Sequence, residues 1–448
     1  MNRRAKLAAA PEQGSVAALT HDGEGIIRDG KTAFVGGALP GEVIRFRRLR
    51  RHRGHDDGEL LEVITASPDR VSPRCRHFGV CGGCALQHLS ADRQIDVKEQ
   101  ELRDALERIA KVTPEAWLPP LRGPLWGYRR RARLGARYVT KKGRVVVGFR
   151  ERLAPYIAAI DQCEVLGAPV GSLIGPLAAM LTGLTCREHI PQIEVAIADN
   201  VTALVLRVLR PVPEADLAAL REFGRQHDLR LYLQTGGLES VAPLDAAPDL
   251  EPLRYSLPQF GVVYDFAPTD FVQINAEINA ALVSRVVSLL DLDSSSRVLD
   301  LYCGLGNFTL PLARHAASVV GVEGDAALAQ RARHNASMNG LTNVQFVAAN
   351  LGQPLAPNAP YLAGGFSHVV LDPPRAGAMG VMPTIAHIAP RKVAYISCHP
   401  GSLARDLAVL VHESGFTLRA VGVLDMFPHT AHVESLAILT PPRGKSRE

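Results

Sequence analysis

The stretch R-V-L-D-L-Y-C-G-L-G-N-F-T-L-P-L-A (residues 297–313) decides the fold of the carboxyl-terminal part of the chain. It predicts a buried strand, a glycine-rich turn and the start of a helix. The next apolar run, S-V-V-G-V-E (318–323), ends in an acid about 20 residues after the turn, which is the spacing of a ribose-hydroxyl acceptor in dinucleotide-binding folds. From about residue 270 onward strands and helices alternate strictly, and this alternation predicts a parallel sheet.

Polar residues end four successive strands of this predicted sheet. Asp300 ends the first strand, Glu323 the second, Asn350 the third and Asp372, in L-D-P-P-R, the fourth. Because the carboxyl ends of parallel strands meet at one edge, we expect these side chains to form a row. The turn has no basic residue to hold a phosphate, so the row favours S-adenosylmethionine over a nicotinamide cofactor. Asp300 would then face its amino group, Glu323 its ribose and Asn350 its adenine, although Asp and Asn also end strands as turn formers.

A cysteine follows another apolar run, in A-Y-I-S-C-H-P (394–400). Cys398 would stand at the carboxyl end of a parallel strand, where open α/β sheets do chemistry; the alternative is a small buried hydrophobe. A second acid, Glu434, lies in the apolar segment H-V-E-S-L-A-I-L and could instead be a cap or one half of an ion pair. Methylation of carbon 5 of uracil needs a thiolate that adds at carbon 6 and a base that removes the carbon 5 proton. We therefore predict Cys398 as the nucleophile and Glu434 as the base.

The preceding part of the chain predicts two further domains, as expected for 448 residues. Short strands separated by glycine turns up to residue 66 fit a small barrel of the OB type, a fold that binds oligonucleotides. Ser90 precedes an amphipathic stretch that predicts a helix over about 90–111, which we expect to pack on the carboxyl-terminal domain. The segment that follows mixes strands with two helices, as in an α+β domain. The predicted boundaries are 1–66, 67–265 and 266–448.

Positive charge is concentrated in two clusters. The chain carries a formal net charge of +5, but R-F-R-R-L-R-R-H-R-G-H (45–55) alone holds six arginines, and G-Y-R-R-R-A-R-L-G-A-R (127–137) holds five. Two such clusters favour a nucleic-acid partner, because arginines bind phosphate groups. A solvated basic loop is the alternative for either cluster taken alone.

The seven cysteines are unevenly spaced, which argues against a disulfide framework and for metal binding or catalysis. Cys75, Cys81 and Cys84 stand close together between glycines, so they form a tight loop of thiols. A fourth ligand would come from Cys163 or Cys186, and Cys186 ends an apolar helix. Four thiolates could hold zinc or an iron–sulfur cluster, and the spacing does not decide between the two.

Several motifs resemble those of a known family. D-P-P-R-A-G (372–377), Y-I-S-C-H-P (395–400) and D-M-F-P-H-T-A-H-V-E (425–434) resemble the signatures of RNA uracil-5 methyltransferases, and the resemblance covers nearly the whole chain. H-D-G-E-G-I and G-A-L-P-G-E-V resemble a TRAM domain. The C-x5-C-x2-C spacing is similar to the 4Fe–4S site of the branch of the family that acts on 23S ribosomal RNA.

The resemblance implies a multidomain fold: an OB-like TRAM barrel, a central α+β domain with an iron–sulfur loop, and a Rossmann-like α/β class I methyltransferase domain. It implies Cys398 as nucleophile and Glu434 as base. The S-adenosylmethionine site would be formed by Gln273, Tyr302, Asn307, Glu323, Asn350 and Asp372, and the 4Fe–4S cluster would be held by Cys75, Cys81, Cys84 and Cys163.

This chain departs from the pattern of the family at three positions. His399 stands where asparagine is usual, Ser402 where threonine is usual, and Tyr302 where phenylalanine is usual. His399 and Ser402 neighbour the thiol, so they bear on how the substrate is held rather than on the reaction. Tyr302 keeps the aromatic ring.

Three other functions remain open. They are an amino-group methyltransferase, since D-P-P-R is similar to the D-P-P-Y of those enzymes; a transfer-RNA uracil-5 methyltransferase; and a non-catalytic RNA-binding protein. The expected partner is 23S ribosomal RNA, without an obligate protein partner, and we expect a monomer. The first ten residues lack the apolar core of a secretion signal, and no apolar run reaches membrane-spanning length, so we expect a cytoplasmic protein.

Overall fold

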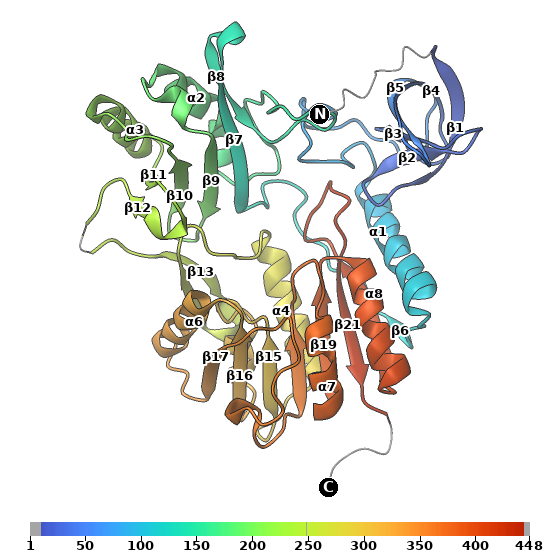
Figure 1. Ribbon diagram of the computed structural model, residues 1–448, viewed down its shortest axis with the longest axis vertical. Coiled ribbons are helices and arrows are strands. Elements are labelled where there is room, and N and C mark those ends of the chain that lie inside the picture. Colours follow the sequence, from blue (N-terminus) through green and yellow to red (C-terminus); the bar gives the residue numbers. More distant parts are fainter. Residues whose placement is uncertain (1–9, 248, 443–448) are drawn as a thin grey trace.

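The computed structural model describes residues 10–247 and 249–442, and Figure 1 shows three regions, with the barrel and the central sheet above the carboxyl-terminal sheet. Residues 1–9, on which the expectation about a secretion signal partly rests, lie outside the described residues. Within the described part, none of the helices combines the length and the apolarity that crossing a membrane requires.

The amino-terminal strands close into a barrel in the order β1-β2-β3-β5-β4. The side chains of Ile27, Val35, Ile44 and Phe46 fill it and are at most 1% exposed. Alternation of apolar and polar residues along each strand produces this inward and outward pattern. The predicted small barrel is therefore confirmed. Its strands are β1 (Glu12–Leu19), β2 (Glu24–Ile27), β3 (Ala33–Gly36), β4 (Val43–Arg51) and β5 (Asp56–Thr65).

The central region is a six-stranded sheet in the order β12-β11-β10-β9-β7-β8, packed against two helices. The predicted strands and both helices are confirmed, but β7 and the short edge strand β12 were missed. In β7 the buried Ala132, Leu134 and Ala136 alternate with arginines, and the arginines had suggested only a basic cluster. The elements are β7 (Arg131–Val139), β8 (Arg144–Gly148), α2 (Val170–Gly183), β9 (Gln192–Ile197), β10 (Thr202–Arg207), α3 (Glu214–Gln226), β11 (Leu229–Gln234) and β12 (Val241–Pro243).

The carboxyl-terminal sheet has eight strands in the order β17-β16-β15-β18-β19-β21-β20-β6. Its first five strands are parallel, as the alternation of strands and helices predicted. The elements are β6 (Ala116–Trp117), α4 (Ala276–Leu290), β15 (Arg297–Leu301), α5 (Thr309–Ala313), β16 (Ser318–Glu323), α6 (Ala326–Met338), β17 (Val344–Ala348), β18 (His368–Leu371), α7 (Met382–Ile388), β19 (Lys392–Ser397), α8 (Pro400–Ala408), β20 (Thr417–Leu424) and β21 (Glu434–Thr440).

The prediction of a purely parallel sheet is wrong at β21. This strand runs antiparallel to both β19 and β20, with Ser397 paired to Ser435 and Leu424 paired to Glu434. The physical reason is the connection: β20 and β21 are joined by residues 425–433 without a helix, and a parallel pair needs a longer crossover. The strict alternation of strands and helices therefore ends after β20.

The helix α1 (Ala91–Ala105) continues into a π-helical turn, Leu106–Ala110, which confirms the helix predicted over about 90–111. Ser90 occupies the position before the helix, but its side chain makes no capping hydrogen bond. The buried face of α1 joins the core of the carboxyl-terminal sheet, where Leu102 and Leu403 belong to one apolar cluster. Figure 1 shows α1 descending from the barrel beside α8. The domain boundaries at residues 66 and 265 stay a prediction.

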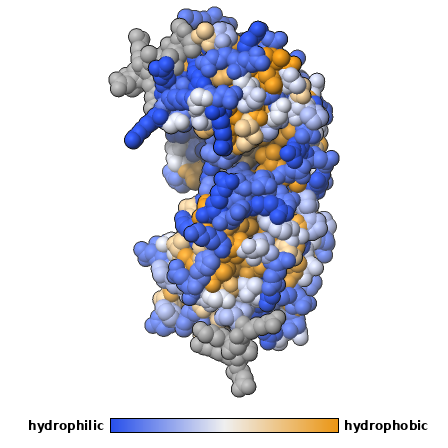
Figure 2. Space-filling view, turned by 90° about the vertical axis from the view of Figure 1, so that its right-hand side faces the viewer, coloured by the Kyte–Doolittle hydropathy of each residue, from blue (hydrophilic) through white to orange (hydrophobic). Residues whose placement is uncertain are grey.

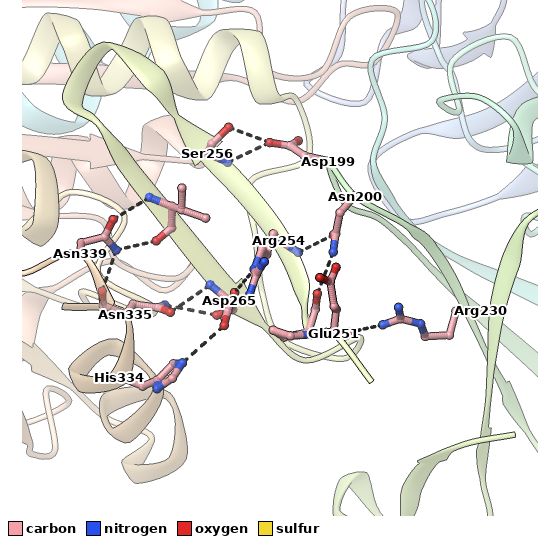
Figure 3. A network of polar contacts seen from close by, with 12 residues as sticks. Asp199, Asn200, Arg230, Glu251, Arg254, Ser256, Asp265, His334, Asn335 and Asn339 are labelled. Carbon is pink, nitrogen blue, oxygen red and sulfur yellow. Dashed lines mark hydrogen bonds and ion pairs between the residues drawn. The ribbon is translucent and has the colours of Figure 1, made fainter. Parts of the chain in front are cut away.

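A hairpin of β13 (Leu253–Leu257) and β14 (Val262–Phe266) connects the central region to the carboxyl-terminal one (Figure 3). On one side, Asp199 accepts hydrogen bonds from the backbone N–H and the hydroxyl of Ser256, both at 2.9 Å. On the other side, the Asn335 amide on α6 accepts from the Asp265 N–H at 3.0 Å. Asn335 also donates to the carbonyls of Asp265 (3.2 Å) and Leu305 (3.3 Å), so it ties the hairpin to the glycine-rich turn.

We predict that Asn335→Ala lowers the free energy of unfolding by about 2–3 kcal/mol, because it leaves buried backbone groups without partners. Denaturant unfolding followed by circular dichroism measures the loss. Asn339→Ala is the matched control on the same helix: its partner Val263 is exposed, and we expect a loss below about 1 kcal/mol. Equal losses in the two variants would contradict the role given to Asn335.

Candidate active site

The pairing of β19 with β21 places two of the predicted site residues opposite each other. Ser397, the last residue of β19, pairs with Ser435 of the antiparallel strand β21. Cys398 follows Ser397 and Glu434 precedes Ser435, so the two lie side by side at the carboxyl edge of the parallel strands. Both are partly exposed, and Cys398 lines a cavity whose wall also includes Val433, the residue before Glu434. This arrangement gives the thiol and the carboxyl group access to the same substrate atoms.

The electrostatics of the pair follow from burial and from neighbouring charges. Burial raises the pKa of the Cys398 thiol to about 11, with Glu434 and Asp372 adding to the rise and Arg375 opposing it. Burial likewise raises the pKa of Glu434 to about 8; Asp372 adds to this rise, and the Lys98 ammonium opposes it. At neutral pH the resting site therefore holds a thiol and a largely protonated carboxyl group.

The strand order arranges the predicted cofactor residues in series. The order β17-β16-β15-β18-β19 gives the row Asn350, Glu323, Asp300, Asp372 and Cys398. Four strand spacings separate the ends of this row, roughly 19 Å. A row of this length suits an elongated ligand whose reactive end lies at Cys398. The expectation that these strand ends share one edge is confirmed.

Two carboxyl groups in the middle of the row are buried or partly buried. Burial raises the pKa of Asp300 to about 7, and its Oδ2 accepts a hydrogen bond from the Thr309 hydroxyl at 2.5 Å. Oδ1 of Asp300 is buried and has no hydrogen-bond partner among the described residues. Burial also raises the pKa of Asp372 to about 7, and its Oδ2 accepts a hydrogen bond from the Gln273 amide at 3.2 Å. The free oxygen of Asp300 is suited to an ammonium group.

The glycine-rich turn between β15 and α5 is shaped by the acid at the end of β16. One oxygen of Glu323 accepts the Gly304 N–H at 2.9 Å and the other accepts the Asp325 N–H at 3.0 Å. Tyr302 has a left-handed backbone, with φ of 62°, and its hydroxyl donates to the Leu351 carbonyl at 3.0 Å. At Gly304, also left-handed, a Cβ would meet open space, so a ligand can approach the backbone there.

The remaining two predicted cofactor residues have partners within the protein. The Asn307 side chain is held by the Asn279 amide at 2.9 Å and by the Tyr255 hydroxyl at 3.2 Å. The exposed Asn350 accepts the Gly352 N–H at 2.9 Å, as in a turn. Their roles toward a cofactor stay a prediction.

The cavity at Cys398 has a volume of about 760 Å³ and lies where the three regions meet. The barrel contributes His21 and Asp22, α1 contributes Glu101, and the central region contributes arginines, among them Arg129 and Arg150. A cavity of this volume is larger than one flat aromatic ring requires, and its arginines make part of its wall basic. On the face of the molecule that carries the barrel and α1, long hydrophilic side chains project from the upper part (Figure 2).

Many arginines of the two basic clusters are paired with acids. In the barrel, Arg45 pairs with Glu62 at 2.6 Å and Arg48 with Asp56 at 3.0 Å. In and beside β7, Arg130 pairs with Asp199 at 2.5 Å and Arg133 with Glu194 at 2.8 Å. Arg48 and Asp56 are largely buried, whereas Arg45 and Glu62 are exposed. Exposed pairs are weak, so they leave their arginines able to bind phosphate. Binding of phosphate by the clusters stays a prediction.

The predicted thiol ligands come together around one small cavity, which is lined by Cys75, Cys81, Cys84 and Cys163. Burial, reinforced by the neighbouring thiols, raises the pKa of Cys81 to about 11 and that of Cys84 to about 12. Cys186 instead lies in the apolar core of the central region. Of the two candidates for the fourth ligand, the structure therefore brings Cys163 to the loop.

Sequence reasoning missed Lys98. Its side chain is 1% exposed, and its Nζ lies 2.7 Å from Asp425 Oδ1. A signal was present: Lys98 lies on the same face of the predicted helix as Ile95 and Leu102, where an apolar residue is the rule. A lysine in that stripe indicates a buried partner.

The chain is similar to proteins of known function. The family described as tRNA (Uracil-5-)-methyltransferase matches residues 255–441. A protein from Alkalilimnicola ehrlichii named 23S rRNA (uracil(1939)-C(5))-methyltransferase RlmD is 47% identical over 97% of this chain and 98% of its own length. A protein of the same name from Nitrosococcus oceani is 48% identical, covering 98% of both chains.

A solved structure has the same fold. It is the Pyrococcus abyssi tRNA (uracil-54, C5)-methyltransferase in complex with S-adenosyl-L-homocysteine, with a TM-score of 0.73 and 24% sequence identity. The similarity covers 96% of this chain and 100% of the other. At this identity the likeness establishes the fold alone.

We predict that iodoacetamide alkylates Cys398 slowly at pH 7 and faster with rising pH, since the thiolate is the reactive form and its pKa is about 11. Glu434→Gln should speed alkylation at pH 9 roughly threefold or more, because it removes a negative charge that opposes thiolate formation. Peptide mass spectrometry measures the rate, and the buried Cys303 is the unreactive reference. An unchanged rate in Glu434→Gln would contradict the proximity of the two groups.

Proposed function

Because the chain belongs to the family of 23S rRNA uracil-5 methyltransferases, we propose that it transfers a methyl group from S-adenosylmethionine to carbon 5 of one uridine in 23S ribosomal RNA. The observation that carries the proposal is the pairing of Ser397 with Ser435, which sets Cys398 beside Glu434 at the edge where the cofactor row ends. A thiol and a carboxyl group on separate strands match the two functions that this reaction needs.

The two groups act in sequence on the pyrimidine ring. The Cys398 thiolate adds to carbon 6, and the electron pair displaced toward carbon 5 makes that atom nucleophilic. Carbon 5 then takes the methyl group. Glu434, as carboxylate, removes the remaining proton from carbon 5; the double bond between carbons 5 and 6 re-forms, and the carbon–sulfur bond breaks. Since both groups must lose a proton, we expect the rate to rise with pH through the pKa of Glu434, about 8.

The donor set of the row fits S-adenosylmethionine. The unpartnered Oδ1 of Asp300 would accept a hydrogen bond from its ammonium group. The open space at Gly304 would let the cofactor approach the backbone of the turn. Glu323 would accept the ribose hydroxyls, with Tyr302, Asn307 and Asn350 completing the site, and the Gln273–Asp372 pair would border the reacting end. When bound, S-adenosylmethionine supplies an activated methyl group.

The cavity supports a folded RNA substrate rather than a free nucleoside. Its wall combines residues of the barrel, the central region and the carboxyl-terminal sheet, including Arg129, Arg150 and Arg375. A base that reaches Cys398 must leave its stack at a cost of a few kcal/mol, which phosphate contacts on arginines would offset. The barrel, as a TRAM domain, would bind the RNA next to the base that has left its stack. We propose that the substrate is ribosomal rather than transfer RNA, because relatives that match over nearly their full length are named 23S rRNA methyltransferases.

We also propose that Cys75, Cys81, Cys84 and Cys163 hold a 4Fe–4S cluster. The four cysteines line one small cavity, and their C-x5-C-x2-C spacing resembles that of the 4Fe–4S branch of the family, which favours a cluster over zinc. Ligation would also remove the protons that burial otherwise holds on the thiols. Localisation in the cytoplasm and a monomeric state stay expectations.

We predict that the purified protein forms 5-methyluridine in unmodified 23S rRNA at one site, mapped by mass spectrometry of RNA fragments. Cys398→Ala should abolish the product and keep S-adenosylmethionine affinity within a few-fold, since the thiol serves the adduct and not the donor. Full activity of Cys398→Ala would favour an amino-group methyltransferase. Product in transfer RNA but not in 23S rRNA would assign the other branch of the family, and no product in either would favour an RNA-binding protein.

We predict that protein purified without oxygen is brown and contains about four irons per chain. Cys163→Ser should lower the iron content and the visible absorbance that makes the protein brown. Cys186 lies in the apolar core, so Cys186→Ser should leave both unchanged. Metal analysis and visible spectroscopy give the readout. Colourless protein with one zinc per chain would contradict the cluster.

A further inference from the structure

The segment that leads into Glu434 is held by a part of the chain far away in sequence. Residues 425–433 connect β20 to β21, and the His429 carbonyl accepts the backbone N–H groups of Ala85 and Leu86, each at 2.9 Å. The Gln94 side chain on α1 accepts the His429 N–H at 2.8 Å. The loop before the general base is therefore ordered by contacts with the segment that contains the cysteine loop and α1.

The buried cation Lys98 fixes the first part of this loop. Its Nζ donates to Asp425 Oδ1 at 2.7 Å and to the Phe427 carbonyl at 3.0 Å. Both side chains of the ion pair are at most 4% exposed. Burial of an unpaired ammonium group costs several kcal/mol of folding free energy. The two acceptors offset this cost and hold the Lys98 side chain in one position. The position of Lys98 is thus fixed relative to the end of β20, where Leu424 pairs with Glu434.

Charged groups face Glu434 from each element packed around it. Asp372 approaches from the end of β18 and Cys398 from the end of β19, and both carry negative charge when ionised. His432 lies on the connecting loop, where burial and the charges of Arg375 and Lys98 lower its pKa. Lys98, from α1, is the cation whose charge opposes the rise in the pKa of Glu434. Burial lowers the pKa of Lys98 itself, and its partner Asp425 opposes this fall.

We propose that Lys98 is a positioning residue for the proton-removal step, in which its pairing with Asp425 fixes the loop before Glu434 and holds an ammonium group near the base. The proposal rests on the proposed function, in which Glu434 takes the proton from carbon 5.

The chemistry of that step explains why a cation is useful there. The carbon 5–hydrogen bond breaks and its proton goes to the Glu434 carboxylate. The electron pair forms the double bond to carbon 6, the carbon 6–sulfur bond breaks, and Cys398 leaves as a thiolate. A protonated Glu434 cannot accept the proton, and the neighbouring Asp372 opposes its ionisation. In the adduct the Cys398 sulfur is bonded to carbon 6 and carries no charge. A fixed ammonium group favours the carboxylate form.

The test measures how fast the methylated adduct releases its RNA. Wild-type protein, Lys98→Gln and Lys98→Arg are mixed with 23S rRNA fragment and S-adenosylmethionine, quenched at intervals from pH 6 to 10, and separated on denaturing gels. For Lys98→Gln we expect the pH midpoint of release to move up by roughly one unit, so that release at pH 7 is about tenfold slower. Lys98→Arg keeps the charge and should keep the midpoint.

A matched control separates charge from loop order. Gln94→Met removes the other contact from α1 to the same loop without changing any charge near Glu434. It should slow release equally at all pH values and leave the midpoint in place. If Lys98→Gln does not fold, the double variant Lys98→Met with Asp425→Asn removes both charges, leaves neither unpaired, and is interpreted in the same way.

A midpoint in Lys98→Gln that equals the wild-type midpoint, whatever the rate, would overturn the role of Lys98. A midpoint in Gln94→Met that moves as far as in Lys98→Gln would do the same, because loop order alone would then explain the shift. Wild-type protein that forms no 5-methyluridine would instead contradict the proposed function, so the two failures are distinguishable.

Discussion

The antiparallel pairing of β19 with β21 is the constraint on which the site depends. Five parallel strands place their carboxyl ends, and the polar residues that follow them, at one edge of the sheet. A sixth parallel strand would bring another carboxyl end there. Because β21 runs the other way, its first residue, Glu434, arrives at the same edge as Cys398. A slip of one residue would turn Glu434 to the opposite face of the sheet.

This geometry brings several acidic groups close together, which opposes their ionisation. Positive charges from other parts of the molecule offset this effect. Burial and the proximity of Asp372 and Glu434 all oppose ionisation of the Cys398 thiol. The charge of Arg375 favours ionisation of the Cys398 thiol, and the charge of Lys98, which comes from α1 outside the sheet, favours ionisation of Glu434. The contacts that α1 and the cysteine loop make with residues 425–433 connect the cysteine-rich part of the chain to the base. The amino-terminal regions therefore contribute to the site as well as to the surface around it.

Local patterns predicted most of the fold. The glycine-rich turn, the apolar runs and their polar ends gave the parallel strands and the row of side chains, because these depend on residues close together in sequence. The strand β7 was missed since its arginines masked the alternation of Ala132 and Leu134. The reversed β21 follows from the short connection after β20, which the alternation of strands and helices did not reveal. The buried Lys98 depends on a contact with Asp425, 327 positions away, which no local pattern encodes. Cys398 and Glu434 were found by their chemistry, but their adjacency required the sheet.

The fate of the adduct in Glu434→Gln tests the two-group mechanism most directly. Glutamine keeps the shape of the side chain but cannot accept the proton, so the thiolate should add, the methyl group should transfer, and release should fail. With natural uridine in the RNA, a denaturation-resistant protein–RNA species that carries label from methyl-labelled S-adenosylmethionine should accumulate. Slow release of methylated RNA without any trapped species would contradict the account, because another group would then remove the proton.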